Sequence, residues 1–380
     1  MSSLTTERRL IFGLLMLGSL TISFNFSAVA ASIPSISASL GLSAFSVSKI
    51  VPFYMIPYGL GALLYAHLTR VFFYRYIFIV SYLVYALMNL ASAFSHDLTV
   101  LLMAQAGAGI AAACSTPLSL MIIGDLFHRK IRGRLIGGYF GASFLASILG
   151  MVCMGILSWH WLFLIPGIFS FITVLLFVFF KTDLLNRRHD EEVNYLKVFS
   201  HKEIRNIFAF IFAMSFLYHG LTKWYGVFLN QQYAMDNKAV SLFLILSSSF
   251  GLLGQQVGGY FTDKRGRIFS SRLGLIILSL GAIALGLCFP KWIVPVILGS
   301  ISIGWTISHN SISTVLTDFP DADRPMIASL NSSVRFISGG LGFSVAKFFV
   351  EKSFSTTFLI IGVIFLLINI VINRVLPKNV

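Results

Sequence analysis

Charged residues are scarce in this chain, and acidic residues are the scarcest. The 380 residues include 14 Asp and Glu against 28 Lys and Arg, and charged residues make up 11% of the total. Soluble domains carry about 25% charged residues, so this composition excludes an ordinary soluble fold. The formal charge of +14 does not indicate a nucleic-acid partner, because the basic residues lie in short loops between apolar runs.

Cysteine is also rare, and several chemical motifs are missing. The three cysteines, Cys114, Cys153 and Cys288, lie inside apolar runs, which excludes a disulfide framework. The sequence has no Gly-x4-Gly-Lys-Ser/Thr loop, so ATP is not expected to be a direct energy source. It shows no cluster of metal ligands and no recognisable nucleophile–base pair. We therefore expect no cofactor, no bound metal and no enzymatic activity.

Long apolar runs are what the chain has in abundance. Hydrophobic residues make up 57% of it. Runs of about 20 apolar residues recur from end to end, and each is long enough to cross a bilayer. We predict an all-α integral membrane protein with twelve spans, at 10–32, 46–66, 72–94, 99–124, 134–157, 160–180, 205–229, 240–261, 269–289, 292–317, 325–349 and 355–374. The first run is interpreted as a retained helix, because it is longer than the apolar part of a signal peptide.

One polar segment, Lys181 to Glu203, divides the spans into two sets of six. We therefore predict an N-terminal half at 1–180, a cytoplasmic linker at 181–204 and a C-terminal half at 205–380. The halves show a weak internal repeat. The fourth span ends near Asp125 and the tenth near Asp318, and a glycine-rich span follows each. Closely spaced glycines permit tight helix packing in lipid.

The distribution of basic residues predicts the orientation. If both termini are cytoplasmic, the inner face holds 21 of the 28 Lys and Arg residues, the outer face six, and one, Arg335, lies inside a span. Such an excess is typical of the cytoplasmic side. Four tryptophans fall towards outer helix ends, where an amphipathic ring is favoured. We expect a multi-pass protein of the cytoplasmic (inner) membrane, in contact with lipid.

A charged hairpin, Gly259-Tyr-Phe-Thr-Asp263-Lys-Arg-Gly266-Arg267, connects the eighth and ninth spans. Gly266 can adopt φ > 0 in such a turn. With its place between two spans, this pattern resembles the signature loop of the major facilitator superfamily of transporters, and the resemblance covers essentially the whole chain. It implies the major facilitator fold and alternating access between two six-helix halves. It also implies gating roles for a set of residues in both halves: Gly259, Asp263, Lys264, Gly266, Arg267, Arg132 and Arg134.

The sequence departs from the family pattern at three places. The matching loop of the first half has Thr69 where the family has an aspartate. The fourth span has Met103 where the family usually carries an arginine implicated in proton coupling, which weakens a proton-driven interpretation. The fifth span lacks the Gly-Pro pair of the family's antiporter signature, whereas Ser158-Trp-His-Trp161 does resemble the family's turn into the sixth span.

Ionisable groups inside spans are costly and are candidates for function. None of the fourteen acids is near the middle of a span. The resemblance implies that helices 1, 4, 7 and 10 line a central cavity beside helices 2, 5, 8 and 11. The substrate-binding candidates are then Asn25, Tyr54, Tyr58, Gln105, His219, Lys223, Gln255, Gln256, His309, Asn310, Asn331 and Arg335.

Each candidate has a structural alternative. Gln255 and Asn331 can simply bond across helices, His219 and His309 can be packing residues, and Lys223 can extend to the outer interface. Arg335 needs a partner because its guanidinium keeps its charge. That partner is a backbone carbonyl, water or an anionic substrate.

These observations predict a monomeric secondary transporter of a small molecule, and efflux is the first interpretation. The alternative is uptake or exchange of an organic anion, which the positive, acid-free interior favours. A receptor that kept the fold and lost transport is the remaining alternative. If a proton or another ion is coupled, His219 or His309 is the expected proton carrier, because an imidazole titrates near neutral pH.

The orientation can be tested by cysteine labelling. A cysteine introduced at Ser95 or Met235 should react with an impermeant reagent from outside intact cells, and one at Asn194 should react only after the membrane is opened. Labelling of position 194 from outside would contradict the twelve-span topology.

Overall fold

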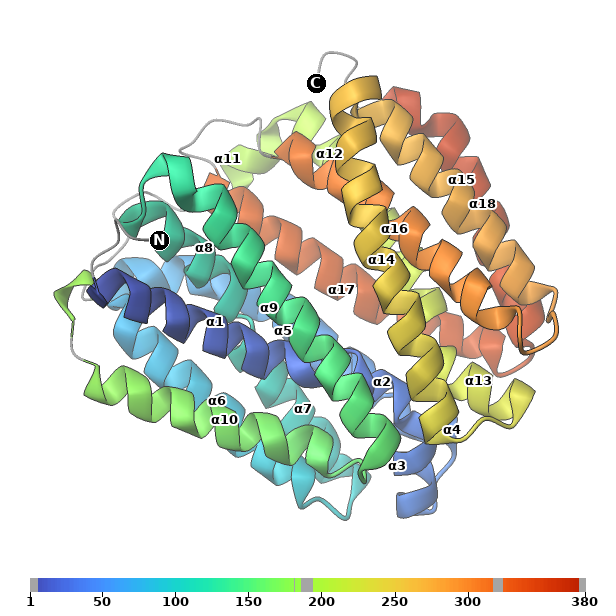
Figure 1. Cartoon of the computed structure of the whole chain (residues 1–380), viewed down its shortest axis with the longest axis horizontal. Coiled ribbons are helices and arrows are strands. Elements are labelled where there is room, and N and C mark those ends of the chain that lie inside the picture. The colour runs from blue at the N-terminus through green and yellow to red at the C-terminus, as the bar shows by residue number, and fades with distance from the viewer. Residues whose placement is uncertain (1–5, 181, 186–193, 317–323, 376–380) are drawn as a thin grey trace. The chain divides into compact units, whose positions relative to one another are not determined.

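The structure is a computed structural model of the chain, and it describes residues 6–180, 182–185, 194–316 and 324–375. Every regular element in these ranges is a helix (Figure 1). The chain forms two compact units. The first unit comprises Met1–Val193 with Ala328–Ile337, and the second comprises Asn194–Ile327 with Ser338–Val380.

The helices of the N-terminal part of the chain belong to the first unit. They are α1 (Thr6–Phe26), α2 (Ala28–Ala31), α3 (Ile33–Leu40), α4 (Ala44–Val47), α5 (Ile50–Val71), α6 (Tyr74–Ala93), α7 (Leu98–Ala112), α8 (Ser115–Leu126), α9 (Arg129–Ile156), α10 (Trp161–Phe179) and the 3-10 turn η1 (Asp183–Leu185).

The later helices belong to the second unit, except for the middle of α17. They are α11 (Tyr195–Ser200), α12 (Lys202–Thr222), α13 (Tyr225–Tyr233), α14 (Asn237–Arg265), α15 (Arg267–Gly286), α16 (Val294–Leu316), α17 (Arg324–Val350) and α18 (Phe354–Val375). Residues Ala328–Ile337 of α17 pack within the first unit.

Eleven helical segments of the described chain are long and apolar enough to cross a membrane. The remaining predicted span, the tenth (292–317), is α16, whose described apolar stretch Val294–His309 is shorter. The all-α membrane fold is therefore confirmed. Three of the spans contain a break in the helix, at Ser27, at Ala113–Cys114 and at Lys223–Trp224.

The helices of the two units pair in the same order. This agrees with the weak repeat in the sequence. In the first unit α1 packs on α9, α5 on α7, and α6 on α10. In the second unit α14 packs on α16 and α15 on α18, in the same positions as α5 with α7 and α6 with α10. Figure 1 shows α1 and α9 side by side, and likewise α15 and α18.

Glycines set the distance between paired helices at equivalent positions of the two units. A Cβ atom added at Gly150 in α9 would collide with the backbone oxygen of Phe24 in α1. A Cβ atom added at Gly342 in α17 would collide with the backbone oxygen of Phe216 in α12. In lipid, apolar burial gives no net drive for helix association, so this close backbone contact contributes much of the packing energy.

A network of neutral polar side chains links the helices inside the first unit. Asn25 Nδ2 donates to Asn89 Oδ1 at 3.0 Å, and Tyr85 Oη donates to Asn25 Oδ1 at 3.3 Å. Gln105 Nε2 donates to Ser92 Oγ at 3.0 Å. Further hydroxyl pairs are Tyr65–Ser81 and Ser115–Tyr139, each with oxygens 2.8 Å apart. Most of the buried amide and hydroxyl groups in this network therefore bond to one another.

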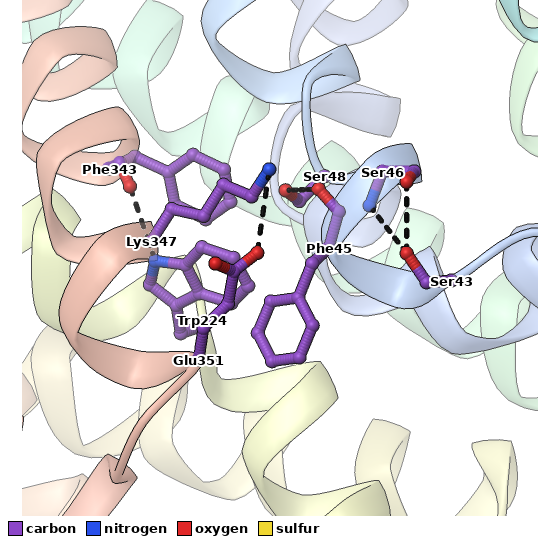
Figure 2. Close-up of polar contacts among 8 residues, drawn as sticks. All are labelled: Ser43, Phe45, Ser46, Ser48, Trp224, Phe343, Lys347 and Glu351. Carbon is purple, nitrogen blue, oxygen red and sulfur yellow. Dashed lines mark hydrogen bonds and ion pairs between the residues drawn. The ribbon is translucent and has the colours of Figure 1, made fainter.

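Aromatic packing dominates one end of the second unit. Trp224 is fully buried and stacks on Phe343 with ring centroids 4.4 Å apart, and its Nε1 donates to the Phe343 backbone oxygen at 3.4 Å (Figure 2). One turn further along α17, Lys347 Nζ lies 3.5 Å from Glu351 Oε1. The indole satisfies its only donor in this way, as a buried tryptophan requires.

Side-chain caps precede the first helices of two spans. Ser43 Oγ accepts the Ser46 backbone N–H at 3.1 Å and starts α4 (Figure 2). Asp97 accepts the backbone N–H groups of Thr99 and Val100 and starts α7. Those bonds, chiefly the one from Val100, lower the pKa of the Asp97 carboxyl, because they favour its charged form.

The close α1–α9 contact predicts opposite effects of one substitution at two glycines of α9. Gly150→Ala should lower the melting temperature, because the new methyl group meets the Phe24 carbonyl and overpacking costs about 1–3 kcal/mol. Gly141→Ala should keep or raise it, since nothing lies within 4 Å of that position and alanine is the better helix former. Thermal unfolding of both variants in one detergent measures the difference. Equal melting temperatures would contradict this account of the contact.

The amide network predicts a stability cost at a residue that was also a substrate candidate. Asn25→Leu should destabilise the protein by about 1–3 kcal/mol for each buried group left unpaired, here on Asn89 and Tyr85. The control Gln256→Leu, on an exposed part of α14, should have little effect. Denaturant unfolding checks both. Unchanged stability of Asn25→Leu with lost substrate binding would instead assign Asn25 to the substrate.

Candidate functional site

Arg335 lies within the membrane span of α17, in the part of that helix that packs in the first unit. Its Nε donates to Asn331 Oδ1 at 2.7 Å. The two residues are one helical turn apart, and both side chains are half-buried. An amide oxygen is neutral, so this bond orients the guanidinium without neutralising its charge.

Four aromatic rings from three helices meet beside this position. We call Phe26, Tyr54, Tyr58 and Phe336 the aromatic cluster. The Tyr58 and Phe336 rings are stacked, with centroids 3.7 Å apart and planes 15° apart. Phe26 lies 5.3 Å from Phe336 and 6.2 Å from Tyr54 by ring centroid. The cluster thus joins α1, α5 and α17 next to Arg335 in the chain.

Close backbone packing holds α17 against α5 at the cluster. A Cβ atom added at Gly59 would lie 2.5 Å from Ile337 Cγ1 and 2.8 Å from the Ser333 backbone oxygen. Only glycine lets the two helices approach this closely. Tyr58, which stacks on Phe336, is the neighbour of Gly59 in α5.

The second unit has its own group of aromatic and basic residues. Tyr218 of α12 and Trp305 of α16 stack with centroids 3.8 Å apart and planes 7° apart. His219 lies 6.1 Å from the Trp305 ring, and His309 lies 5.5 Å from it. The structure therefore brings both predicted histidines to one indole. Lys223 follows one turn after His219, where α12 ends, and is 8% exposed.

The remaining substrate candidates lie in three different settings. Gln105 is buried and bonded to Ser92, as Asn25 is to Asn89. Gln255 and Gln256 are exposed on α14. Asn310 is in α16, and its side chain is outside the part of the chain that the structure describes. These roles stay predictions.

The signature hairpin forms as expected from its glycine. Gly266 has φ +82° and separates α14 from α15. Lys264 Nζ donates to the Tyr260 hydroxyl at 2.7 Å, and Arg265 lies over the Phe269 ring. The backbone of Asp263 belongs to α14, and its side chain is outside the described residues.

The two arginines that share the predicted gating role, Arg132 and Arg134, lie in the first turns of α9. Arg132 Nε donates to the Phe127 backbone oxygen at 2.8 Å, and so helps to hold the turn before α9. Arg134 is exposed. Gly259, Asp263, Lys264, Gly266 and Arg267 remain gating candidates together with these two arginines.

Sequence reasoning missed four of the aromatic residues at these sites: Phe26, Phe336, Tyr218 and Trp305. Phe336 and Tyr218 are direct neighbours of the candidates Arg335 and His219, and Phe26 follows Asn25. Their position next to polar candidates could have indicated that these aromatic residues belong to the same sites. The chain contains 37 phenylalanines, however, so an aromatic residue beside a polar one is too common to identify a site.

Comparison of the sequence with known proteins gives distant relatives of more than one kind. A protein named "Probable L-galactonate transporter" from Escherichia coli (strain K12) is 24% identical over 251 residues, which are 59% of this chain and 54% of that protein. "Multidrug resistance protein 3" from Bacillus subtilis (strain 168) is 28% identical over 156 residues, 40% of this chain and 30% of that protein. The chain thus matches about half or less of the length of these curated relatives.

Solved structures share the fold along the whole chain. The bacterial homologue of the human lysosomal transporter Spinster, in an inward-facing conformation, has a TM-score of 0.78 at 14% identity and covers 97% of each chain. A D-xylose-proton symporter has a TM-score of 0.78 at 15% identity, over 98% of this chain and 99% of that one. The family described as Major Facilitator Superfamily matches residues 15–343. The chain is a multi-pass membrane protein and belongs to the Major Facilitator Superfamily.

Proposed function

We propose that this transporter exports a small organic anion across the cytoplasmic membrane by alternating access, and that Arg335 binds the negative group. The observation that carries the proposal is the position of Arg335. It is a cation inside a membrane span, held by the neutral oxygen of Asn331 at 2.7 Å. No span of the sequence contains an acid near its middle.

The cost of placing a charge in the membrane favours a substrate of opposite charge. A cation at the centre of a membrane helix costs about 2.5–3.5 kcal/mol on insertion scales. The Asn331 oxygen that accepts a hydrogen bond from Arg335 is neutral, whereas a carboxylate would also bring an opposite charge. The remaining cost of keeping Arg335 in the span is offset when such a substrate binds.

Two considerations support export. The relatives include "Multidrug resistance protein 3" of Bacillus subtilis and "Probable efflux pump mfs2" of Aspergillus flavus. In addition, a membrane potential that is negative inside drives an anion outward, with about 2.3 kcal/mol per charge for each 100 mV. An exporter of anions therefore needs no coupled proton.

Uptake or exchange of an organic anion is the second candidate. The relative named "Probable L-galactonate transporter" favours it, since galactonate is a carboxylate. Uptake against the potential would require a coupled cation, and His219 and His309 beside Trp305 are the groups that could carry a proton. Flux in proteoliposomes under an imposed potential of either sign, with and without a pH gradient, separates the two candidates.

Substitution of Arg335 tests the proposal directly. Arg335→Leu should abolish binding and counterflow of carboxylates such as benzoate and D-gluconate, because a charged hydrogen-bond partner is worth about 1.5–3 kcal/mol. Arg335→Lys should bind more weakly than wild type, because lysine keeps the charge but lacks the planar guanidinium that can form two parallel hydrogen bonds with a carboxylate. Both variants should insert and fold, and Arg335→Leu should be at least as stable as wild type.

The matched control is Lys347→Leu, which removes a cation from the same helix where Glu351 already balances it. It should leave binding unchanged. Wild-type affinity in both Arg335 variants would show that Arg335 is a packing residue and that the anion proposal is wrong.

A further inference from the structure

We infer that the second unit binds an anionic phospholipid at the seam between α15 and α18, where Arg272 and Asn369 hold the lipid phosphate. The lipid is one whose headgroup carries a net negative charge, such as phosphatidylglycerol. Its acyl chains lie on exposed apolar side chains of the two helices. This lipid site is separate from Arg335, so it does not depend on the proposed function.

Arg272 is a cation inside a span, and its buried nitrogen lacks a partner. It lies near the start of α15, within the span Arg267–Gly286, and its side chain is half-buried. Its Nε is buried and forms no hydrogen bond with any described residue. A guanidinium keeps its proton and presents its donors in one plane, which is the geometry that a phosphate accepts.

The packing of α15 on α18 has a regular register. Ser355 donates to the backbone oxygen of Gly286, and Ser279 donates to that of Gly362 at 2.6 Å. Between these two contacts each helix advances by seven residues, which is about two turns, so the contacts lie on one face of each helix. The two helices therefore run side by side in opposite directions (Figure 1).

Two further turns along the same faces place Arg272 opposite Asn369. Asn369 Oδ1 is also buried, and it forms no hydrogen bond with Arg272 or with any other described residue. Both residues belong to the second unit and to membrane spans. The seam thus holds a donor and an acceptor that are both unused. The amide of Asn369 also carries an NH2 group, which can donate to a phosphate oxygen beside the guanidinium.

Apolar side chains border this seam. On α15 the residues one turn before and one turn after Arg272 are exposed, and so are two residues next to Asn369 on α18. We call these four residues the apolar rim: Phe269, Ile276, Leu367 and Ile370. Exposed side chains of a span contact acyl chains, so a phosphate group bound here suits a molecule with apolar tails. A soluble phosphate would leave the rim unused.

The charge at this end of α15 favours an anionic headgroup over a zwitterionic one. Residues 263–272 contain four basic residues and one acid. The Arg265 guanidinium lies 5.4 Å from the centre of the Phe269 ring, and Lys264 is exposed. The ammonium group of phosphatidylethanolamine would be repelled by these cations, whereas the headgroup of phosphatidylglycerol carries no positive charge.

Lipid titration of the purified full-length protein tests the site. The protein is freed of lipid in detergent, and dioleoyl phosphatidylglycerol, phosphatidylethanolamine or phosphatidylcholine is added. Native mass spectrometry measures the fraction of protein with bound lipid, and the melting temperature measures the stabilisation that binding produces. Phosphatidylglycerol should bind about fivefold or more tightly than the other two lipids, in line with the attraction of one cation for an anionic surface.

A soluble phosphate ester distinguishes a lipid site from a phosphate site. Glycerol 3-phosphate carries the same phosphate group without acyl chains, so it should produce no shift in melting temperature at concentrations where phosphatidylglycerol does. An equal shift with both would show that the site takes a soluble phosphate, and the lipid inference would be wrong.

Two substitutions separate lipid binding from a packing role. Arg272→Gln should weaken phosphatidylglycerol binding about fivefold, because it removes one cation near the membrane surface. Asn369→Asp should weaken it at least as much, since the new carboxylate pairs with Arg272 and repels the phosphate. If the two residues only pack together, Asn369→Asp adds an ion pair and leaves lipid binding unchanged. The matched control is Lys202→Gln, which removes an exposed cation at the start of α12 and should have no effect.

The outcomes are independent of the anion proposal for Arg335. Equal binding of the three lipids, or wild-type binding of phosphatidylglycerol by both seam variants, would overturn the lipid inference. So would a loss in Lys202→Gln as large as that in Arg272→Gln, because it would show attraction to the surface charge in general. Arg335→Leu should bind phosphatidylglycerol as the wild type does, whatever its effect on carboxylates.

Discussion

The structure depends on one constraint: a polar group inside the membrane must find its partner within the protein. Water is absent there, so the backbone satisfies itself as helices, and every side-chain donor or acceptor needs a neighbour at bonding distance. The first unit meets this demand with neutral pairs such as Asn25 with Asn89 and Tyr65 with Ser81. Arg335 carries a charge in this setting, and it donates a hydrogen bond to the neutral oxygen of Asn331, which is why we propose it as the residue that binds an anion.

The same constraint explains why glycine recurs at the helix contacts. Side chains gain little by leaving lipid for another apolar surface, so association relies on close backbone approach. Gly150 against Phe24 and Gly342 against Phe216 perform this role at equivalent places in the two units. Gly59 does so where α17 meets α5. The repeat that is weak in sequence is therefore clear in the packing.

The fold was predictable because each of the sequence patterns that indicate it extends over many residues. Apolar runs of membrane length and the hairpin around Gly266 predicted the helices, their order and the family, and membership of a transporter family confirms that the chain is not an enzyme. The site was less predictable because it is formed by contacts between individual residues that are distant in the sequence. The cost of charge in lipid drew attention to Arg335, whereas the Tyr58–Phe336 stack depends on two residues far apart in the chain.

The interruptions of the spans were also not foreseen. A proline does not by itself interrupt a span here, since α5 continues through Pro57. The break at Ala113–Cys114 precedes Pro117, which has no N–H to bond the Ala113 carbonyl. The breaks at Ser27 and Lys223–Trp224 have no proline in the four residues that follow, so no such local signal marks them. Tertiary packing, which a single sequence does not display, decides where those helices stop and restart.

The membership of residues 328–337 in the first unit has a consequence for biosynthesis. The segment that covers Phe26, Tyr58 and Gly59 is encoded close to the end of the chain. Chains grow at about 5–20 residues per second, so the first unit waits on the order of ten seconds for this segment after its other helices have been made. During that interval the aromatic cluster is incomplete, and the ribosome-bound chain presents Tyr58 and Gly59 uncovered by α17. The first unit therefore completes its packing only after most of the second unit has been synthesised.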